Sequence, residues 1–358
     1  MKRAIVILTL LIFALALWMS HSSSKRLNEK SDLENSKTNV LAARTAPKHS
    51  SSKTRLESDS TNSVPENDEE TGGLKKLSRE QVEAYLLKTK RSPESLLNAF
   101  IETGDTNFLA EAVEKYSDNP IVQWTMLNRA SPEERSQWLE KLKATSPDNA
   151  LPNYLSALDD FKAGKTDQAL AEIDSASKKK LSSYERERAQ SREEMYLLAG
   201  YSHLEAKEKT SRTLDVPNLS ETKQLSQEIG YLQQKYKAAG DAGSNQQLAA
   251  VGIEIGRKYS DPSSPYLVNQ LVGYAIENNA LRNLDSETYY DFLGKTAGDR
   301  IQEIKDQRQE MKNLARTFTQ TYPTFSDAEK LIYINRRMLY GELNTWRWLN
   351  RNYGSETK

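Results

Sequence analysis

The sequence contains no cysteine and only three histidines, His21, His49 and His203. The lack of cysteine excludes disulfides, zinc–thiolate sites, iron–sulfur clusters and thiol nucleophiles. A charge excess of either sign is also absent, because 50 Lys and Arg residues balance 50 Asp and Glu residues. Proteins that mainly bind nucleic acid usually carry a basic excess, so we expect no nucleic-acid partner.

Residue patterns typical of enzymes are scarce as well. His203 has neither a nucleophile nor a His-x-x-x-His partner nearby in the sequence. Glu94-Ser95 resembles the Glu-Ser pair of lytic transglycosylases, but the preceding Ser92-Pro93 favours a helix N-terminus, where an acid interacts well with the helix dipole. Gly252 and Gly256 lack the features of a phosphate loop and favour close helix packing. We therefore assign no catalytic, cofactor-binding or metal-ligating residue, and we expect no cofactor.

One long apolar run lies at the N-terminus. Lys2 and Arg3 are followed by the uncharged stretch Ala4–Met19, a pattern typical of export signals. Residues 1–20 are thus predicted to be a signal peptide or an N-terminal membrane anchor. Ala14-Leu15-Ala16 resembles a cleavage site, whereas the continuation of the run past Ala16 favours an anchor. If the segment is kept, we expect residues 4–19 to lie in a bacterial inner membrane with the body outside the cytoplasm. If it is cleaved, we expect a periplasmic or secreted protein.

Two segments have no periodic apolar face. Residues 21–75 are rich in Ser, Thr, Asn, Lys and Glu, so they cannot bury enough apolar surface to offset chain entropy. We interpret them as a disordered linker, with contact of its basic half with lipid headgroups or cell wall as the alternative. Residues 354–358 are predicted to be a disordered tail.

Helix signals recur from Leu77 onward. Serine stands at several of the predicted helix starts. Two serines precede a proline: Ser92 with Pro93 and Ser131 with Pro132. Four form predicted capping boxes: Ser78 with Gln81, Ser182 with Glu185, Ser202 with Glu205 and Ser326 with Glu329. Gly104, Gly164 and Gly200 stand where left-handed residues end helices. Strand-like alternation and hairpin signals are missing, so the predicted fold class is all-α.

A repeat is visible within residues 76–210. Asp118-Asn119 and Asp148-Asn149 lie thirty positions apart, and five positions after each Asn comes an aromatic residue, Trp124 or Tyr154. The stretch Pro147–Ala176 resembles the tetratricopeptide (TPR) repeat, although its period is near thirty rather than thirty-four. This resemblance implies antiparallel helix pairs that stack as a right-handed α-solenoid.

Residues 217–353 show longer apolar stripes. They predict longer helices, including Ala297–Thr321 and a final helix from Asp327 to about Asn350. We expect a C-terminal helical bundle, with a domain boundary near Val216-Pro217. The helix at 297–321 either packs within its own domain or pairs as a coiled coil in a homodimer. The stretch Trp346–Tyr353 either docks into a core or grips an anionic polymer.

Four longer stretches carry a second resemblance: LSREQVEAYLLKTKRSPESLLNAF, DNALPNYLSALDDFKAG, YLLAGYSHLEAK and NQLVGYAIENNAL. They are similar to a family of uncharacterised exported helical-repeat proteins from Verrucomicrobia-type bacteria. The resemblance implies export and a helical fold, and it implies no activity.

Together these features favour a non-enzymatic binding or scaffold protein of the bacterial cell envelope. Its paired helices would present a concave groove to a protein or peptide partner. One alternative is an envelope glycan-acting hydrolase or lyase that uses carboxylates. Another is a structural spacer that oligomerises through its C-terminal helices.

Overall fold

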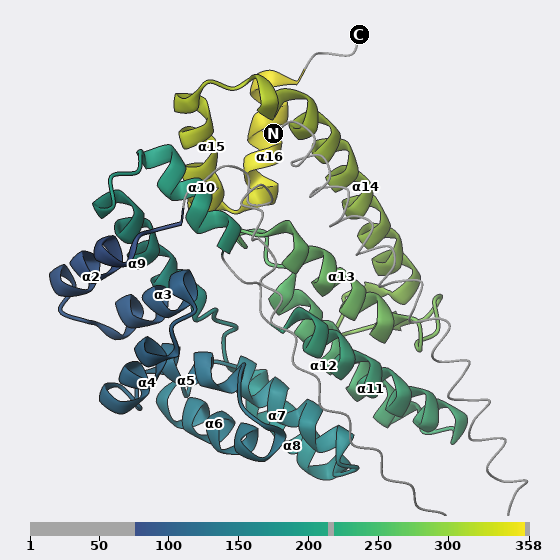
Figure 1. Ribbon diagram of the computed structural model, residues 1–358. Helices are drawn as coiled ribbons and strands as arrows, with labels where there is room; N and C mark the ends of the chain where they lie inside the picture. Colours follow the sequence, from purple (N-terminus) through teal and green to yellow (C-terminus); the bar gives the residue numbers. More distant parts are fainter. Residues whose placement is uncertain (1–75, 214–217, 355–358) are drawn as a thin grey trace, which may run out of the picture. The chain divides into compact units, whose positions relative to one another are not determined.

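The computed structural model describes residues 76–213 and 218–354, and these belong to one compact unit. The predictions for residues 1–20, for 21–75, for Val216-Pro217 and for the last four residues lie outside the described part. Within it, fifteen α-helices, one 3-10 turn and one two-stranded hairpin account for the secondary structure, so the predicted all-α class is confirmed (Figure 1). None of the helices in 76–213 and 218–354 combines the length and the apolarity that crossing a bilayer requires.

The first nine helices are short and follow one another closely. They are α2 (Arg79–Lys88), α3 (Pro93–Thr103), α4 (Thr106–Lys115), α5 (Pro120–Leu127), α6 (Pro132–Thr145), α7 (Leu151–Lys162), α8 (Thr166–Ser177), α9 (Glu185–Leu198) and α10 (His203–Thr213). Ser78 starts α2 in a capping box and Ser131 is the N-cap of α6 before Pro132, as predicted, and Glu134 adds a capping box at Ser131. Gly104, at φ 73°, ends α3 in the left-handed conformation.

The predicted capping box at Ser182 is wrong. Helix α9 begins at Glu185 with Tyr184 at its N-cap position and no side-chain cap. Ser182 is held elsewhere, because its backbone N–H donates to Asn149 Oδ1 at 3.1 Å and its carbonyl accepts from Asn149 Nδ2 at 3.0 Å. Hydrogen bonds with Asn149, 33 positions away, therefore take the place of the capping bonds predicted within α9.

Consecutive helices pair in the middle of this segment. Helix α5 packs on α6, α7 packs on α8, and α6 joins the two pairs. Trp124 and Tyr154, the aromatic residues of the repeat, are both buried. Helix α9, however, returns to α2 and α3, where Met195 and Tyr196 join a core with Leu86 and Leu96. A solenoid stacks each repeat only on its neighbours, and this return adds a long-range contact to that arrangement.

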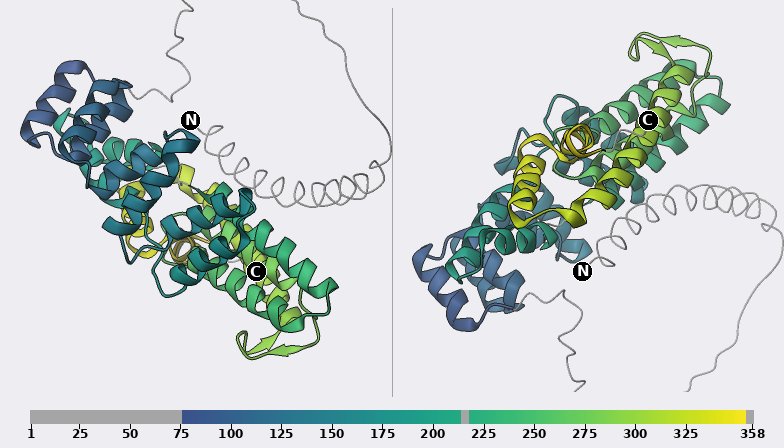
Figure 2. Two further views of the ribbon diagram at one scale, coloured as in Figure 1. Left: turned by 90° about the horizontal axis from the view of Figure 1, so that it is seen from below. Right: turned by 90° about the horizontal axis from the view of Figure 1, so that it is seen from above.

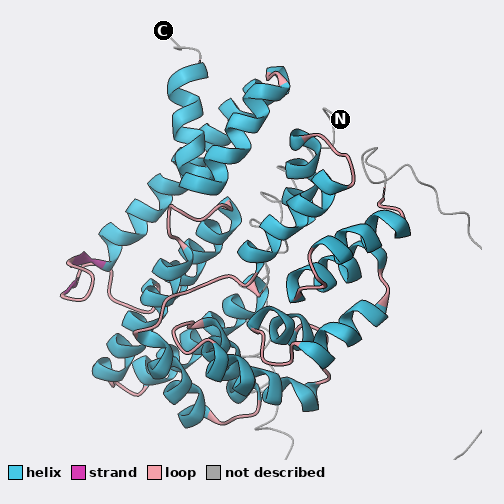
Figure 3. Ribbon diagram, turned by 90° about the vertical axis from the view of Figure 1, so that its left-hand side faces the viewer, coloured by secondary structure: helices cyan, strands magenta, loops and turns pink. Residues whose placement is uncertain are grey.

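The second segment consists of longer helices. Its elements are α11 (Leu219–Ala238), α12 (Ala242–Tyr259), α13 (Leu267–Leu281), β1 (Tyr289–Tyr290), β2 (Lys295–Thr296), α14 (Ala297–Thr321), the 3-10 turn η1 (Tyr322–Thr324), α15 (Asp327–Tyr340) and α16 (Glu342–Tyr353). Helices α11 to α13 run alongside one another in both views of Figure 2. The bounds of α14 match the prediction. The short antiparallel β1–β2 hairpin before α14 had no counterpart in the sequence patterns (Figure 3).

The predicted single helix from Asp327 to Asn350 is two helices, and the prediction is corrected at Gly341. Gly341 has φ 86°, and a side chain there would collide with the carbonyl oxygen of Pro262. The next residue, Glu342, donates its backbone N–H to Ser264 O at 3.1 Å. The chain therefore breaks its helix to pack against the loop before α13.

The two segments share a hydrophobic core. Helix α11 packs on α7, and one cluster joins Tyr154 and Ile173 of the first segment to Leu225 and Ile276 of the second. Both described segments belong to the same compact unit.

Candidate functional site: a polar groove between α14 and α16

The inner faces of α14 and α16 meet over an aromatic core. Phe318 of α14 stacks on Trp346 of α16 with ring centroids 5.2 Å apart, and Trp346 Nε1 donates to the Tyr333 hydroxyl at 3.0 Å. Leu349 is fully buried beside them. The packing interpretation of the stretch Trp346–Tyr353 is thus confirmed for its two apolar anchors.

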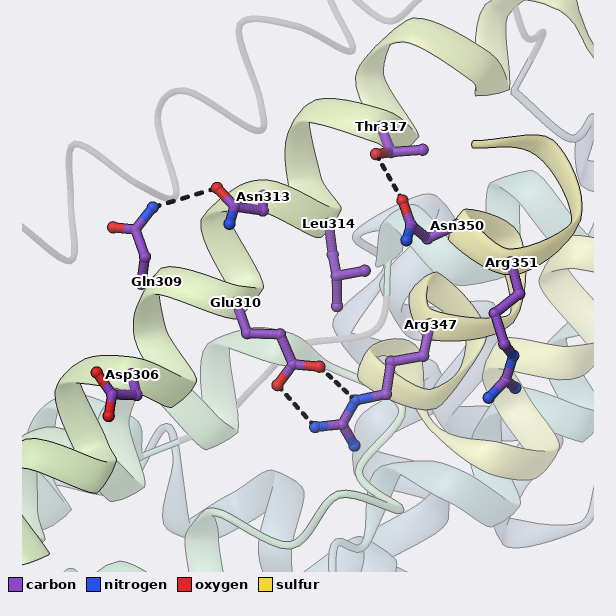
Figure 4. A pocket seen from close by; sticks show the side chains of 9 residues that line it. All are labelled: Asp306, Gln309, Glu310, Asn313, Leu314, Thr317, Arg347, Asn350 and Arg351. Carbon is purple, nitrogen blue, oxygen red and sulfur yellow. Dashed lines mark hydrogen bonds and ion pairs between the residues drawn. The ribbon is translucent and has the colours of Figure 1, made fainter. Parts of the chain in front are cut away.

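A groove of about 740 Å³ runs along the outer edge of this contact (Figure 4). Polar side chains make up most of its lining, which consists of Asp306, Gln309, Glu310, Asn313, Leu314, Thr317, Arg347, Asn350 and Arg351. The α14 residues recur every three or four positions, so they project from one side of that helix. Buried Leu314 lies beneath them.

One ion pair fixes the two walls of the groove to each other. Arg347 Nε and Nη2 donate to the two carboxylate oxygens of Glu310, both at 2.8 Å. This hydrogen bonding lowers the pKa of Glu310 below its usual value. Bidentate pairs impose a fixed geometry, so this one sets the spacing between α14 and α16.

Neutral polar groups form the rest of the groove. Gln309 Nε2 donates to Asn313 Oδ1 at 3.2 Å along α14, and Thr317 Oγ1 donates to Asn350 Oδ1 at 3.0 Å between the helices. These bonds leave the Asn313 and Asn350 amide N–H groups available, since both residues are exposed. Exposed Arg351 adds a guanidinium at one end (Figure 4). The groove therefore offers donors, acceptors and one cation.

The chemistry of the lining suits binding better than catalysis. A general acid near neutral pH needs a raised pKa, but the pKa of Glu310 is lowered by Arg347. Thr317 has Asn350, not a base, as its hydrogen-bond partner. No group of three or more potential metal ligands occurs among residues 76–213 and 218–354.

Two other sequence candidates, Glu94 and His203, lie at helix starts. Glu94 is in the first turn of α3, whose N-cap Ser92 accepts from the Ser95 N–H at 3.3 Å. His203 is exposed at the first position of α10. Gly252 and Gly256 lie on the face of α12 that meets α13, as the packing interpretation predicted.

Two acids away from the groove have structural partners. Glu277 is fully buried, and its two carboxylate oxygens accept from Arg300 Nε at 2.6 Å and Nη2 at 2.8 Å. Burial raises the pKa of Glu342, whose Oε2 accepts from the backbone N–H of Leu267 at 2.7 Å. Glu342 therefore caps the first turn of α13.

Of this groove, the sequence patterns pointed only to the α16 wall, through the alternative that Trp346–Tyr353 grips an anionic polymer, and to no residue of α14. Asp306 and Glu310 belong to the charged outer face of the long helix, which reads as ordinary solvated surface. A signal was nonetheless present. Positions 306, 310, 313 and 317 form a polar stripe beside the buried stripe, and that stripe has amide and hydroxyl groups in its second half.

In comparisons with known proteins, no family model, no curated protein and no solved structure matches this chain.

Proposed function

We propose that this protein is a non-enzymatic binding protein of the bacterial cell envelope that holds an extended polypeptide segment in the α14–α16 groove. The observation that carries the proposal is the row of side-chain amides and hydroxyls at helical spacing on α14, opposite Asn350 and Arg351 of α16. An extended backbone has alternating N–H and C=O groups that such a row can pair with. Arg351 favours an acidic side chain in the same segment.

The Arg347–Glu310 pair supports this function by preorganising the groove. Because the walls are already fixed, a ligand does not have to order them, and less binding free energy is lost. The two intra-groove bonds of Gln309 and Thr317 are weak, neutral and partly exposed. They can exchange for bonds to a ligand at small cost.

The lining disfavours the glycan-acting alternative at this site. Glycosidases place two carboxyl groups on either side of the scissile bond, and one of them must be a proton donor. Asp306 and Glu310 lie one turn apart on the same helix, and Glu310 is ion-paired with Arg347. The facing geometry is absent from this pair.

The test is site-specific photo-crosslinking in the native host. A photoreactive phenylalanine analogue at Asn313, in the groove, is expected to give one or a few defined protein adducts. The matched control places the analogue at Lys312, which is exposed on the same turn of α14 but does not line the groove.

A second variant tests the chemistry of recognition. Arg351→Glu reverses the charge of an exposed side chain, so the fold is expected to persist while the adduct at position 313 weakens about tenfold or more. Equal adducts at 313 and 312, or an adduct unchanged by R351E, would overturn the proposal.

A further inference from the structure

The outward face of α15 is apolar. Ile332, Leu339 and Tyr340 are 50%, 72% and 52% exposed, although the same helix also buries Tyr333 and Ile334. A surface helix normally turns polar residues to solvent. Of the large apolar side chains exposed in the described residues, four lie on α15 and α16, whereas Leu87, Leu198 and Tyr289 lie singly elsewhere. A contiguous exposed apolar surface indicates a contact.

This surface continues onto α16 through an arginine. The Arg336 guanidinium lies 5.1 Å from the Tyr340 ring centroid and 4.4 Å from that of Trp348. Trp348 in turn makes an edge contact with Tyr353 at 5.8 Å. We call the set Ile332, Arg336, Leu339, Tyr340, Trp348 and Tyr353 the α15 face.

The geometry points to an anionic phospholipid bilayer surface as the occupant of the α15 face. Aliphatic tips with tyrosine, tryptophan and a ring-stacked arginine are the composition of membrane–water interfaces, where the rings lie at headgroup depth. The charge order of the helix agrees, because Asp327 and Glu329 lie in its first turn, whereas Arg336 lies beside Tyr340 near its exposed apolar end.

The size of the face and the rest of the chain favour this occupant over a second copy. The α15 face has only six side chains on two helices, far fewer than the roughly 20–30 residues per partner of a stable dimer interface. The chain also carries the predicted bilayer segment Ala4–Met19, 56 residues before Lys76. Even fully extended, those residues reach about 190 Å. Anchoring in the bilayer would therefore keep the α15 face near the lipid surface at a high effective concentration, which strengthens a weak contact.

The absence of cysteine allows a direct test. Leu339→Cys in the full chain, labelled with an environment-sensitive fluorophore, is reconstituted in vesicles of phosphatidylethanolamine and phosphatidylglycerol. We expect blue-shifted emission that nitroxides on the lipid chains quench. The matched control is Leu87→Cys, whose side chain is 81% exposed on α2, and we expect no quenching there.

Two further arms separate the lipid from other occupants. Ile332→Asp, added to the labelled L339C chain, is expected to lower the ratio of docked to undocked protein about tenfold, because one aliphatic side chain no longer inserts. Vesicles of phosphatidylcholine alone are expected to quench less. Absence of lipid quenching at position 339, or equal quenching at position 87, would overturn the inference. A blue shift at position 339 without lipid quenching would also overturn it, because it would mean that a protein covers the α15 face.

Discussion

Two consecutive residues with a left-handed backbone form the turn between α2 and α3. Lys90 and Arg91 have φ of 54° and 53°, values that residues other than glycine and asparagine rarely adopt. The strain is balanced by ion pairs, since Arg91 donates to Glu111 at 2.8 and 2.6 Å and to Glu83 at 3.1 Å. One side chain thus holds α2, α4 and the strained turn together.

We predict that Lys90→Ile destabilises the protein by about 1 kcal/mol or more, because a β-branched side chain tolerates positive φ least. Lys90 is exposed, so no packing change is involved. Urea denaturation measures the difference. Lys90→Asn is the matched control and should leave the midpoint unchanged, because asparagine accepts this conformation. An equal midpoint for the two variants would show that the turn is not strained.

The Arg91–Glu111 pair should make stability depend on pH. The hydrogen bonds from Arg91 lower the pKa of Glu111 from its usual 4.5 to about 2. The ionised pair therefore contributes stability that is complete above about pH 4.5 and is lost as the pH falls towards 2. We predict that Glu111→Gln costs about 1 kcal/mol at pH 7, since the pair is partly exposed.

Urea titrations of E111Q and the native chain at several pH values check this expectation. The difference between the two should shrink below pH 4.5. Glu114→Gln, on the exposed side of the same helix, serves as the control. A difference between E111Q and the native chain that is independent of pH would contradict the assignment.

At the scale of elements, glycines decide how closely α12 and α13 approach. A Cβ atom at Gly256 would lie 2.7 Å from Gly273 O and 2.8 Å from the Glu277 backbone nitrogen. Backbone atoms cannot move away as a flexible side chain can. We predict that Gly256→Ala destabilises the protein by at least about 2 kcal/mol.

Thermal and urea unfolding of G256A provide the measurement. Gly243→Ala, near the start of the same helix, meets only Asp241 Oδ1 at an ordinary 3.6 Å. It should be neutral or stabilising, because alanine has the higher helix propensity. Native-like stability of G256A, or an equal loss of stability in both variants, would show that the close approach at Gly256 does not explain the effect.

Local signals predicted most element boundaries, and long-range contacts explain the exceptions. The boxes at Ser78, Ser131 and Ser326 work because the interacting groups lie within four residues. The break at Gly341 depends on the loop at Pro262 and Ser264, which no local pattern encodes. The groove was missed for the same reason. Its two walls come from helices whose outer faces look solvated one at a time.

At the scale of the whole molecule, the core shared by α7 and α11 predicts one cooperative unfolding transition. Leu225 is fully buried in the cluster that joins the two segments. We predict that Leu225→Ala costs about 3 kcal/mol and lowers amide-exchange protection by similar factors in α5–α8 and α11–α13.

Hydrogen exchange with mass spectrometry resolves the two segments separately. Leu87→Ala, at an exposed leucine of α2, is the control and should leave exchange rates unchanged. If L225A affected only α11–α13, the segments would be independent folding units despite their contact.

The packing of α9 against α2 and α3 has a consequence for folding during synthesis on the ribosome. The Tyr85 hydroxyl donates to Ser191 O at 3.1 Å, and Tyr196 donates to Glu102 at 2.8 Å, so partners are separated by 106 and 94 positions. Synthesis at about 5–20 residues per second therefore leaves α2 and α3 exposed for several seconds before their cover is made. Helices α2 and α3 emerge before the other described helices but complete their core only when α9 has followed, and a holding factor or a translocation machine has that interval in which to keep them unfolded.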